Sequence, residues 1–236
     1  MKSKIFDGVW FYINRIHGIV LLLLGSKQKR VYVMGDSHSL IFQRRIGVMC
    51  RHLGPITLHR FGRDGEAKAL FHAAFGWPRR LNWLPFPYPT VTSTVVLSFG
   101  EIDIRAHVDR VSREKSLQPS QVIQDLVKSA INGCIELGAI TDARLVFLAP
   151  PPPVDGLSDE KFPTGGSFQD RVVWMNQLKT GIANEIALLS DNRVHFCDLA
   201  EKFSSEDGGL KSEYSDGNVH YRREIGTQFL SKILNL

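Results

Sequence analysis

Cysteine is scarce in this sequence, with three residues in 236. Cys50, Cys134 and Cys197 are far apart and odd in number, so they supply neither a disulfide framework nor a zinc-type CxxC pair. We therefore expect reduced thiols that are mostly buried. A scaffold stabilised by disulfides is excluded.

The sequence also lacks the signatures of several ligand-binding classes. It has no internal repeat, no GxGxxG motif and no Walker loop, and the stretch at residues 62–65 (GRDG) matches neither motif. His59, His72, His107 and His195 show no ligand spacing with a second histidine or a carboxylate. We expect neither a metal ion nor another cofactor.

Charge of one sign is not concentrated anywhere. The 29 Lys and Arg residues exceed the 24 Asp and Glu residues, and the net charge is +5. The basic clusters at residues 79–80, 110–115 and 222–223 are short and dispersed. A basic balance without a readable binding motif is weak support for nucleic-acid binding, and we expect no nucleic-acid partner.

A long uninterrupted hydrophobic run is missing as well. Residues 5–24 are apolar, but their charge-free part begins only at Gly18, whereas a spanning helix needs about 20 predominantly apolar residues. A secretory cleavage site is also lacking, because basic residues follow at once. We expect residues 1–29 to form a helix packed on the domain. We therefore expect a cytoplasmic protein. The alternative is a helix on a membrane surface, in which residues 1–24 make peripheral membrane contact.

What the sequence does contain is the composition of a folded α/β domain. It is 43% hydrophobic and 22% charged, which is typical of a globular protein with a sizeable core and not of a disordered, collagen-like or coiled-coil chain. Short apolar runs alternate with segments of helical periodicity from residue 30 onward. We expect strands at residues 30–34, 56–61, 93–99, 144–149 and 193–197. We expect helices at residues 39–53, 66–75, 119–137, 168–189 and 221–234.

This alternation predicts one domain over residues 30–236. Strands joined by helices favour right-handed crossovers, and so a three-layer αβα sandwich with a mostly parallel, five-stranded, flavodoxin-like sheet. In such sheets ligands bind beyond the carboxyl ends of the strands. Three long loops are expected there, at residues 77–89, 105–119 and 150–166. The first carries aromatic residues that form either a substrate wall or a plug over the core: Trp77, Trp83, Phe86 and Tyr88.

Two polar motifs fall at strand ends. The first predicted strand runs into GDSHS at residues 35–39, where the Ser37 hydroxyl would face the crevice and the following amides would stabilise negative charge. Serine in such a turn is also a common helix cap. SDGNVH at residues 215–220 precedes the last predicted helix and supplies a histidine to accept a proton and an acid to orient it. Together the motifs predict nucleophilic catalysis by serine.

Four blocks in this order resemble the SGNH/GDSL hydrolase family of serine esterases and acyl hydrolases. They are GDSHS at residues 35–39, GRDGEA at 62–67, FGEIDIR at 99–105 and SDGNVHY at 215–221. The resemblance extends from about residue 31 to the end and leaves residues 1–30 unexplained. It implies an SGNH-hydrolase fold and hydrolysis of an acyl ester.

The resemblance also assigns roles to individual residues. It implies that Ser37 is the nucleophile, His220 the general base and Asp216 the acid that orients the base. The backbone N–H groups of Ser37 and Gly65 correspond to oxyanion donors. Asp36 and Gly100, which stand in these blocks, are further candidates for the oxyanion and substrate site.

The third block departs from the family pattern. The family has Gly-x-Asn-Asp, in which the Asn side chain donates to the oxyanion, whereas Ile102 stands at the Asn position before Asp103. Isoleucine cannot donate a hydrogen bond. Either the oxyanion hole works with fewer donors, or another group supplies one, and Arg105 and His38 are the first candidates. Alternatively, Arg105 forms a salt bridge with Asp103, Glu101 or Asp36.

The spacing of the last block differs too. Asp216 lies four residues before His220, and the family has three. Gly217 would absorb the extra residue because it tolerates unusual backbone angles. Otherwise His220 would work as a dyad with Ser37, or a backbone carbonyl would orient it.

The sequence therefore predicts a serine hydrolase that cleaves a small acyl ester through a Ser-His-Asp triad and an acyl-enzyme. By the resemblance, we expect an acetyl group on a carbohydrate, so the partner is a small-molecule or glycan ester. Two alternatives remain open. One is an O-acyltransferase, which differs only in the nucleophile that reaches the acyl-enzyme. The other is a non-catalytic module that binds a glycan or another ligand on the same fold.

Overall fold

The computed structural model describes the chain from β1 to the C-terminus with a few gaps. The described residues are 13, 30–43, 45, 47–76, 89, 91–156 and 163–236. The helix expected at residues 1–29 falls outside them apart from Ile13, and so do the aromatic residues expected to form a wall or a plug at residues 77–88.

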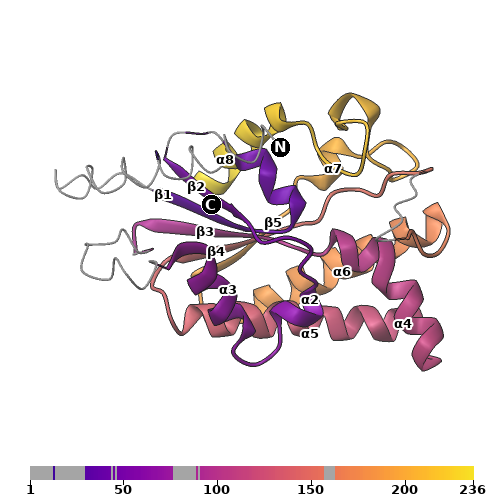
Figure 1. Cartoon of the computed structure of the whole chain (residues 1–236), viewed down its shortest axis with the longest axis horizontal. Helices are drawn as coiled ribbons and strands as arrows, with labels where there is room; N and C mark the ends of the chain where they lie inside the picture. Colours follow the sequence, from indigo (N-terminus) through magenta and orange to yellow (C-terminus); the bar gives the residue numbers. More distant parts are fainter. Residues whose placement is uncertain are drawn as a thin grey trace.

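A five-stranded, all-parallel sheet forms the centre of the molecule (Figure 1). Its strands lie in the order β2-β1-β3-β4-β5. The chain therefore adds β2 on one side of β1 and then β3, β4 and β5 in turn on the other side. The strands are β1 (Arg30–Gly35), β2 (Val48–His52), β3 (Ser93–Ser98), β4 (Arg144–Leu148) and β5 (Val194–Cys197). The expected parallel sheet is confirmed.

Helices cover both faces of the sheet, which confirms the three-layer sandwich (Figure 1). The larger layer consists of α2 (Leu58–Phe61), α3 (Glu66–Phe75), α5 (Pro119–Gly138) and α6 (Phe168–Leu188). The opposite layer consists of η1 (Ser37–Phe42), α7 (Ala200–Phe203), η5 (Arg223–Ile225) and α8 (Gly226–Leu234). The remaining segments are η3 (Asp103–His107), α4 (Val108–Lys115) and η4 (Ser212–Tyr214).

Each layer has its own aromatic core. In the larger core Phe61 of α2 stacks on Phe99 after β3, with ring centroids 4.8 Å apart. In the smaller core Phe203 and Phe229 stack at 5.5 Å, and the Tyr221 ring packs against both. Tyr221 follows His220 directly, so the smaller core fixes the chain next to that histidine.

The second strand and the first helix differ from the prediction. The strand expected at residues 56–61 is instead β2 at residues 48–52, and residues 56–61 lead into α2, which the Thr57 side chain caps by accepting from Arg60 N. A helix was expected at residues 39–53, but the only helical residues that the structure describes there belong to the short η1, which ends at Phe42, so the prediction was wrong beyond that point. β2 lies at the sheet edge with Arg51 exposed, so its sequence lacks a continuous apolar run.

The charged loop expected at residues 105–119 is largely helical. Residues 103–107 form a π-helical turn and α4 follows without a break. Pairs of opposite charge four residues apart stabilise α4 on its exposed side, as between Asp109 Oδ2 and Arg113 Nη2 at 2.5 Å. Such a helix has little apolar periodicity, which explains why the sequence pattern indicated a loop.

Two further expectations concern the cysteines and the membrane. All three cysteines are free and buried, as predicted. Within the described residues, no helix has both the length and the apolar character needed to cross a membrane.

Candidate active site

Ser37 lies at the carboxyl edge of the sheet, where β1 turns into η1. The turn is tight because β1 approaches β3 closely: a Cβ on Gly35 would lie 2.1 Å from the carbonyl oxygen of Ser98. Asp36 caps η1, and its Oδ1 accepts from His38 N at 2.9 Å. Ser37 is therefore held between a paired strand and a capped helical turn.

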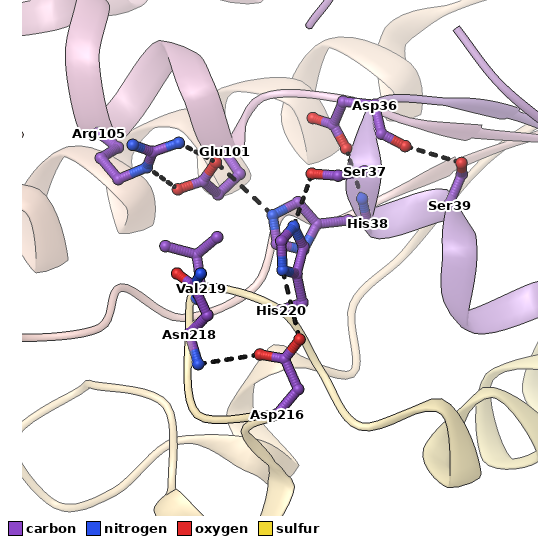
Figure 2. A network of polar contacts seen from close by, with 10 residues as sticks. All are labelled: Asp36, Ser37, His38, Ser39, Glu101, Arg105, Asp216, Asn218, Val219 and His220. Carbon is purple, nitrogen blue, oxygen red and sulfur yellow. Dashed lines mark hydrogen bonds and ion pairs between the residues drawn. The ribbon is translucent and has the colours of Figure 1, made fainter. Parts of the chain in front are cut away.

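His220 reaches Ser37 from the other end of the chain (Figure 2). Its Nε2 is 2.8 Å from Ser37 Oγ. The loop that carries it is closed by a bridge between Ser215 and Tyr221, and Asp216 N donates to the carbonyl oxygen of His220 at 3.0 Å. Residues 183 positions apart thus form the hydrogen bond that a serine nucleophile and its base require.

Asp216 lies on the far side of the imidazole. Its Oδ2 is 3.5 Å from His220 Nδ1, and its Oδ1 accepts from Asn218 N at 2.9 Å. Gly217 adopts a left-handed φ of 92°, so it accommodates the extra residue in this block. This contact with His220 is long, and it is also solvated because 43% of the Asp216 side chain is exposed.

A second charged group, which the sequence analysis did not place in the site, lies beside Ser37 and His220 (Figure 2). Glu101 Oε1 accepts from Arg105 Nε at 2.6 Å, and Glu101 Oε2 is 3.6 Å from His38 Nε2. The His38 and His220 rings are 4.9 Å apart between centroids. Of the alternatives left open for Arg105, the structure shows the salt bridge with Glu101. The signal for Glu101 was its place in the third block, four residues before an arginine.

Burial and these charges shift the pKa values of His220, His38 and Glu101. Burial and the positive charge of His38 lower the pKa of His220 to about 4. Burial opposes a charge on His38, but the contact with Glu101 and the attraction of Asp36 raise its pKa. Burial would also raise the pKa of Glu101, yet His38 and Arg105 lower it to about 2. At neutral pH His220 is therefore an unprotonated base, and Glu101 is ionised.

Three other predicted site residues brace this region. Asp36 is 1% exposed, and burial raises its pKa to about 6. Gly100 turns the chain after β3 with a left-handed φ of 110°. Asp103 is fully buried, and its Oδ2 accepts from Leu58 N at 2.8 Å, which fixes the start of α2. Asp103 thus contacts the scaffold rather than Ser37.

Two glycines are candidate backbone donors. Gly65, the expected oxyanion donor, is the N-cap residue of α3, with a left-handed φ of 76°. Gly54 is the second residue after β2, with open space around its Cβ position. The residue before it contacts the end of β1, because Leu53 N donates to the carbonyl oxygen of Gly35 at 2.9 Å.

Ile102 is 5% exposed and packs into the protein, so it supplies no donor. Across the described part of the chain, no group of three His, Cys, Asp or Glu side chains could hold a metal ion. The groups that meet beside Ser37 are His220 and the largely buried ion pair of Glu101 with Arg105 (Figure 2).

Comparisons with known proteins identify solved structures of similar fold. No protein family model matches the chain, and no curated protein matches it. Two solved structures resemble it at full domain length. One is "a putative platelet activating factor" from Streptococcus pneumonia, with 14% identity, a TM-score of 0.54, and coverage of 99% of this chain and 94% of that chain. The other is "a putative acylhydrolase" from Bacteroides fragilis, with 16% identity, a TM-score of 0.53, and coverage of 87% and 84%. The chain therefore shares the α/β fold of these two structures, with an all-parallel five-stranded sheet.

Proposed function

We propose that this protein is a serine hydrolase that cleaves a small acyl ester. The observation that carries the proposal is the 2.8 Å contact between Ser37 Oγ and His220 Nε2 at the carboxyl edge of the sheet. The similarity to a structure named as an acylhydrolase supports the same reaction class. A spacing too long for any hydrogen bond would have favoured a binding module.

The reaction begins with proton transfer from Ser37 to His220. Neutral His220 accepts the proton at Nε2 while Ser37 Oγ attacks the ester carbonyl carbon. This requires the tautomer with hydrogen on Nδ1, which faces Asp216. The imidazolium then gives its proton to the departing alcohol oxygen, and an acyl-Ser37 ester remains.

The developing negative charge on the carbonyl oxygen requires donors. The backbone N–H groups of Ser37 and Gly54 are our candidates, and Gly65 remains the donor implied by the family resemblance. In comparable acyl-transfer sites one such donor contributes about 3–4 kcal/mol to the transition state. With Ile102 in place of an asparagine, the site works with one donor fewer or obtains it elsewhere.

Water then attacks the acyl-enzyme with His220 as the base and releases the acid. An acetyl group on a carbohydrate remains our preferred substrate class, since the family resemblance implies it. If a carbohydrate hydroxyl attacks in place of water, the protein is an O-acyltransferase. The burial of Ile102 keeps a second candidate open, a glycan-binding module without efficient chemistry.

The test is hydrolysis of p-nitrophenyl acetate and longer acyl homologues by the wild type and by Ser37→Ala. We expect turnover that the variant loses by at least about a thousandfold, because no other group replaces the nucleophile. Ser39→Ala is the matched control, since Ser39 Oγ donates to the carbonyl oxygen of Asp36 at 2.7 Å and does not face His220. Equal rates for the wild type and Ser37→Ala would contradict the proposal and favour the binding module.

A further inference from the structure

His38 and Glu101 form a buried pair that the reaction above does not use. The side chain of His38 is 4% exposed and that of Glu101 is 10% exposed. Their 3.6 Å contact is too long for a full hydrogen bond and is short enough for a strong ion pair at low dielectric. Arg105 donates to both carboxylate oxygens, from Nε to Oε1 at 2.6 Å and from Nη2 to Oε2 at 3.4 Å, and so fixes the direction of Glu101.

The two histidines of the site have different surroundings. The His38 ring contacts the buried carboxylate of Glu101, and its backbone N–H donates to the buried Asp36, whose charge also favours a proton on the ring. His220 faces Ser37 and the half-exposed Asp216. With ring centroids 4.9 Å apart, a proton on one imidazole opposes a proton on the other, so the pair titrates as a unit.

We propose that His38 is a positioning residue that carries the proton of this histidine pair, held there by Glu101, and thereby keeps His220 available as the base in acidic solution. The inference rests on the proposed function, because it concerns the base of that same site. It assigns the second histidine of the GDSHS block to control of protonation, whereas Ser37 and His220 carry the chemistry.

Every charged group that faces His220 enters this balance. His38 on η1 and Arg105 on η3 oppose a proton on His220, and Arg105 acts more weakly. Asp216 in its own loop and Glu101 after β3 favour one. Glu101 is largely neutralised by the two cations that it binds, and Asp216 is solvated. Burial is the largest influence on the pKa of His220, and His38 is the largest influence among the neighbouring charged groups.

The consequence concerns the acid limit of activity. An isolated histidine base is lost below about pH 6.5. Here burial and His38 extend the neutral form of His220 to about pH 4. Hydrolysis should persist through pH 5, where a solvent-exposed histidine base would be mostly protonated.

The experiment is an NMR titration of the histidine side chains in the folded full chain, for wild type and His38→Gln. We expect the midpoint of His220 to rise by about one pH unit or more in the variant, because a neighbouring positive charge is removed. His220→Gln assigns the His220 signal. His59→Gln, at an exposed histidine on α2, is the matched control and should leave the midpoint unchanged.

Glu101→Gln provides a second test if His38→Gln fails to fold. It removes the carboxylate that favours a proton on His38, so the midpoint of His38 should fall by about one unit. In the wild type, His38 should take up its proton at a higher pH than His220. An unchanged His220 midpoint in His38→Gln, or the reverse order of protonation, would overturn the proposal.

The titration needs no substrate, so it separates this inference from the proposed function. If the wild type is active, the acid limb of kcat/KM should shift with the His220 midpoint in His38→Gln. If the wild type is inactive on every ester but the midpoints move as expected, the hydrolase proposal fails and the histidine pair stands.

Discussion

Asp216 is the least tightly held member of the triad, and this should be visible in kinetics. Because its contact with His220 Nδ1 is 3.5 Å long and 43% of the Asp216 side chain is exposed, Asp216→Asn should lower kcat by about 10- to 100-fold. His220→Gln removes the base itself and should cost at least about a thousandfold. Steady-state hydrolysis of a p-nitrophenyl ester measures both. Equal losses would mean that Asp216 closes onto His220 tightly in the working enzyme.

Asp103 predicts how stability depends on pH. Burial raises its pKa to about 7 from an ordinary 3.8, so between these values the folded state holds a proton that the unfolded state has released. The free energy of unfolding should therefore fall as the pH rises from about 4 to 7. Asp103→Asn mimics the protonated form, because its amide oxygen can still accept from Leu58 N.

Urea unfolding at pH 5 and pH 8 measures this effect. Asp103→Asn should be more stable than the wild type by about 4 kcal/mol at pH 8 and by only about 1–2 kcal/mol at pH 5. A residual slope is expected in the variant, because the pKa of Asp36 is also raised, to about 6. An identical fall in the wild type and the variant would show that Asp103 is not the group responsible.

At the residue scale the sequence was informative where chemistry dictates residue type. Ser37, His220 and Asp216 were predicted from their motifs and lie together as expected. Glu101 was not predicted, because a carboxylate after a strand is common and only the fold brings it to a histidine of another strand end. Gly54 was not singled out as a candidate, because residues 48–52 were not predicted to form the strand that precedes it.

At the scale of elements, Gly133 controls how closely α5 approaches α2. A Cβ there would lie 2.2 Å from Cε1 of Phe61, whose ring stacks on Phe99. Gly133→Ala should therefore destabilise the protein by about 1–3 kcal/mol through overpacking, despite the better helix propensity of alanine. Denaturant unfolding measures the change, with Asn132→Ala on the exposed face of α5 as the control. A gain in stability in Gly133→Ala would contradict the close packing of the two helices.

The burial of apolar side chains explains which helices and strands could be predicted from the sequence. The helices α3, α5 and α6 were found because they pack one apolar face on the sheet, and β1, β3 and β4 because they are covered on both faces. β5 was found as well, although it lies at an edge of the sheet. β2 was missed because its short apolar run is followed directly by the exposed Arg51 and His52, and α4 because its exposed charged side chains leave little apolar pattern. Their positions follow from the sheet and from α5, which local sequence does not encode.

At the scale of the whole molecule, the two cores hold different parts of the structure in place. The larger core holds α2, α3, α5 and α6 on the sheet, whereas the smaller core holds η1, which begins with Ser37, and the segment that carries His220. Tyr221 is 3% exposed in the smaller core and is bonded in the chain to His220. The geometry of the site therefore depends on the packing of the smaller core, although no ring of that core touches the reacting atoms.

Two matched substitutions test this division of roles. Phe229 in the smaller core and Phe71 in the larger core are 1% and 0% exposed, so Phe→Leu should cost each about 1–2 kcal/mol of stability. Phe229→Leu should also lower kcat several-fold at 25 °C, because Tyr221 loses part of the surface that fixes the His220 loop. Phe71→Leu should lower Tm alone. Thermal unfolding and ester hydrolysis on both variants measure the contrast, and equal losses of kcat at equal losses of stability would mean that the cores act as one unit.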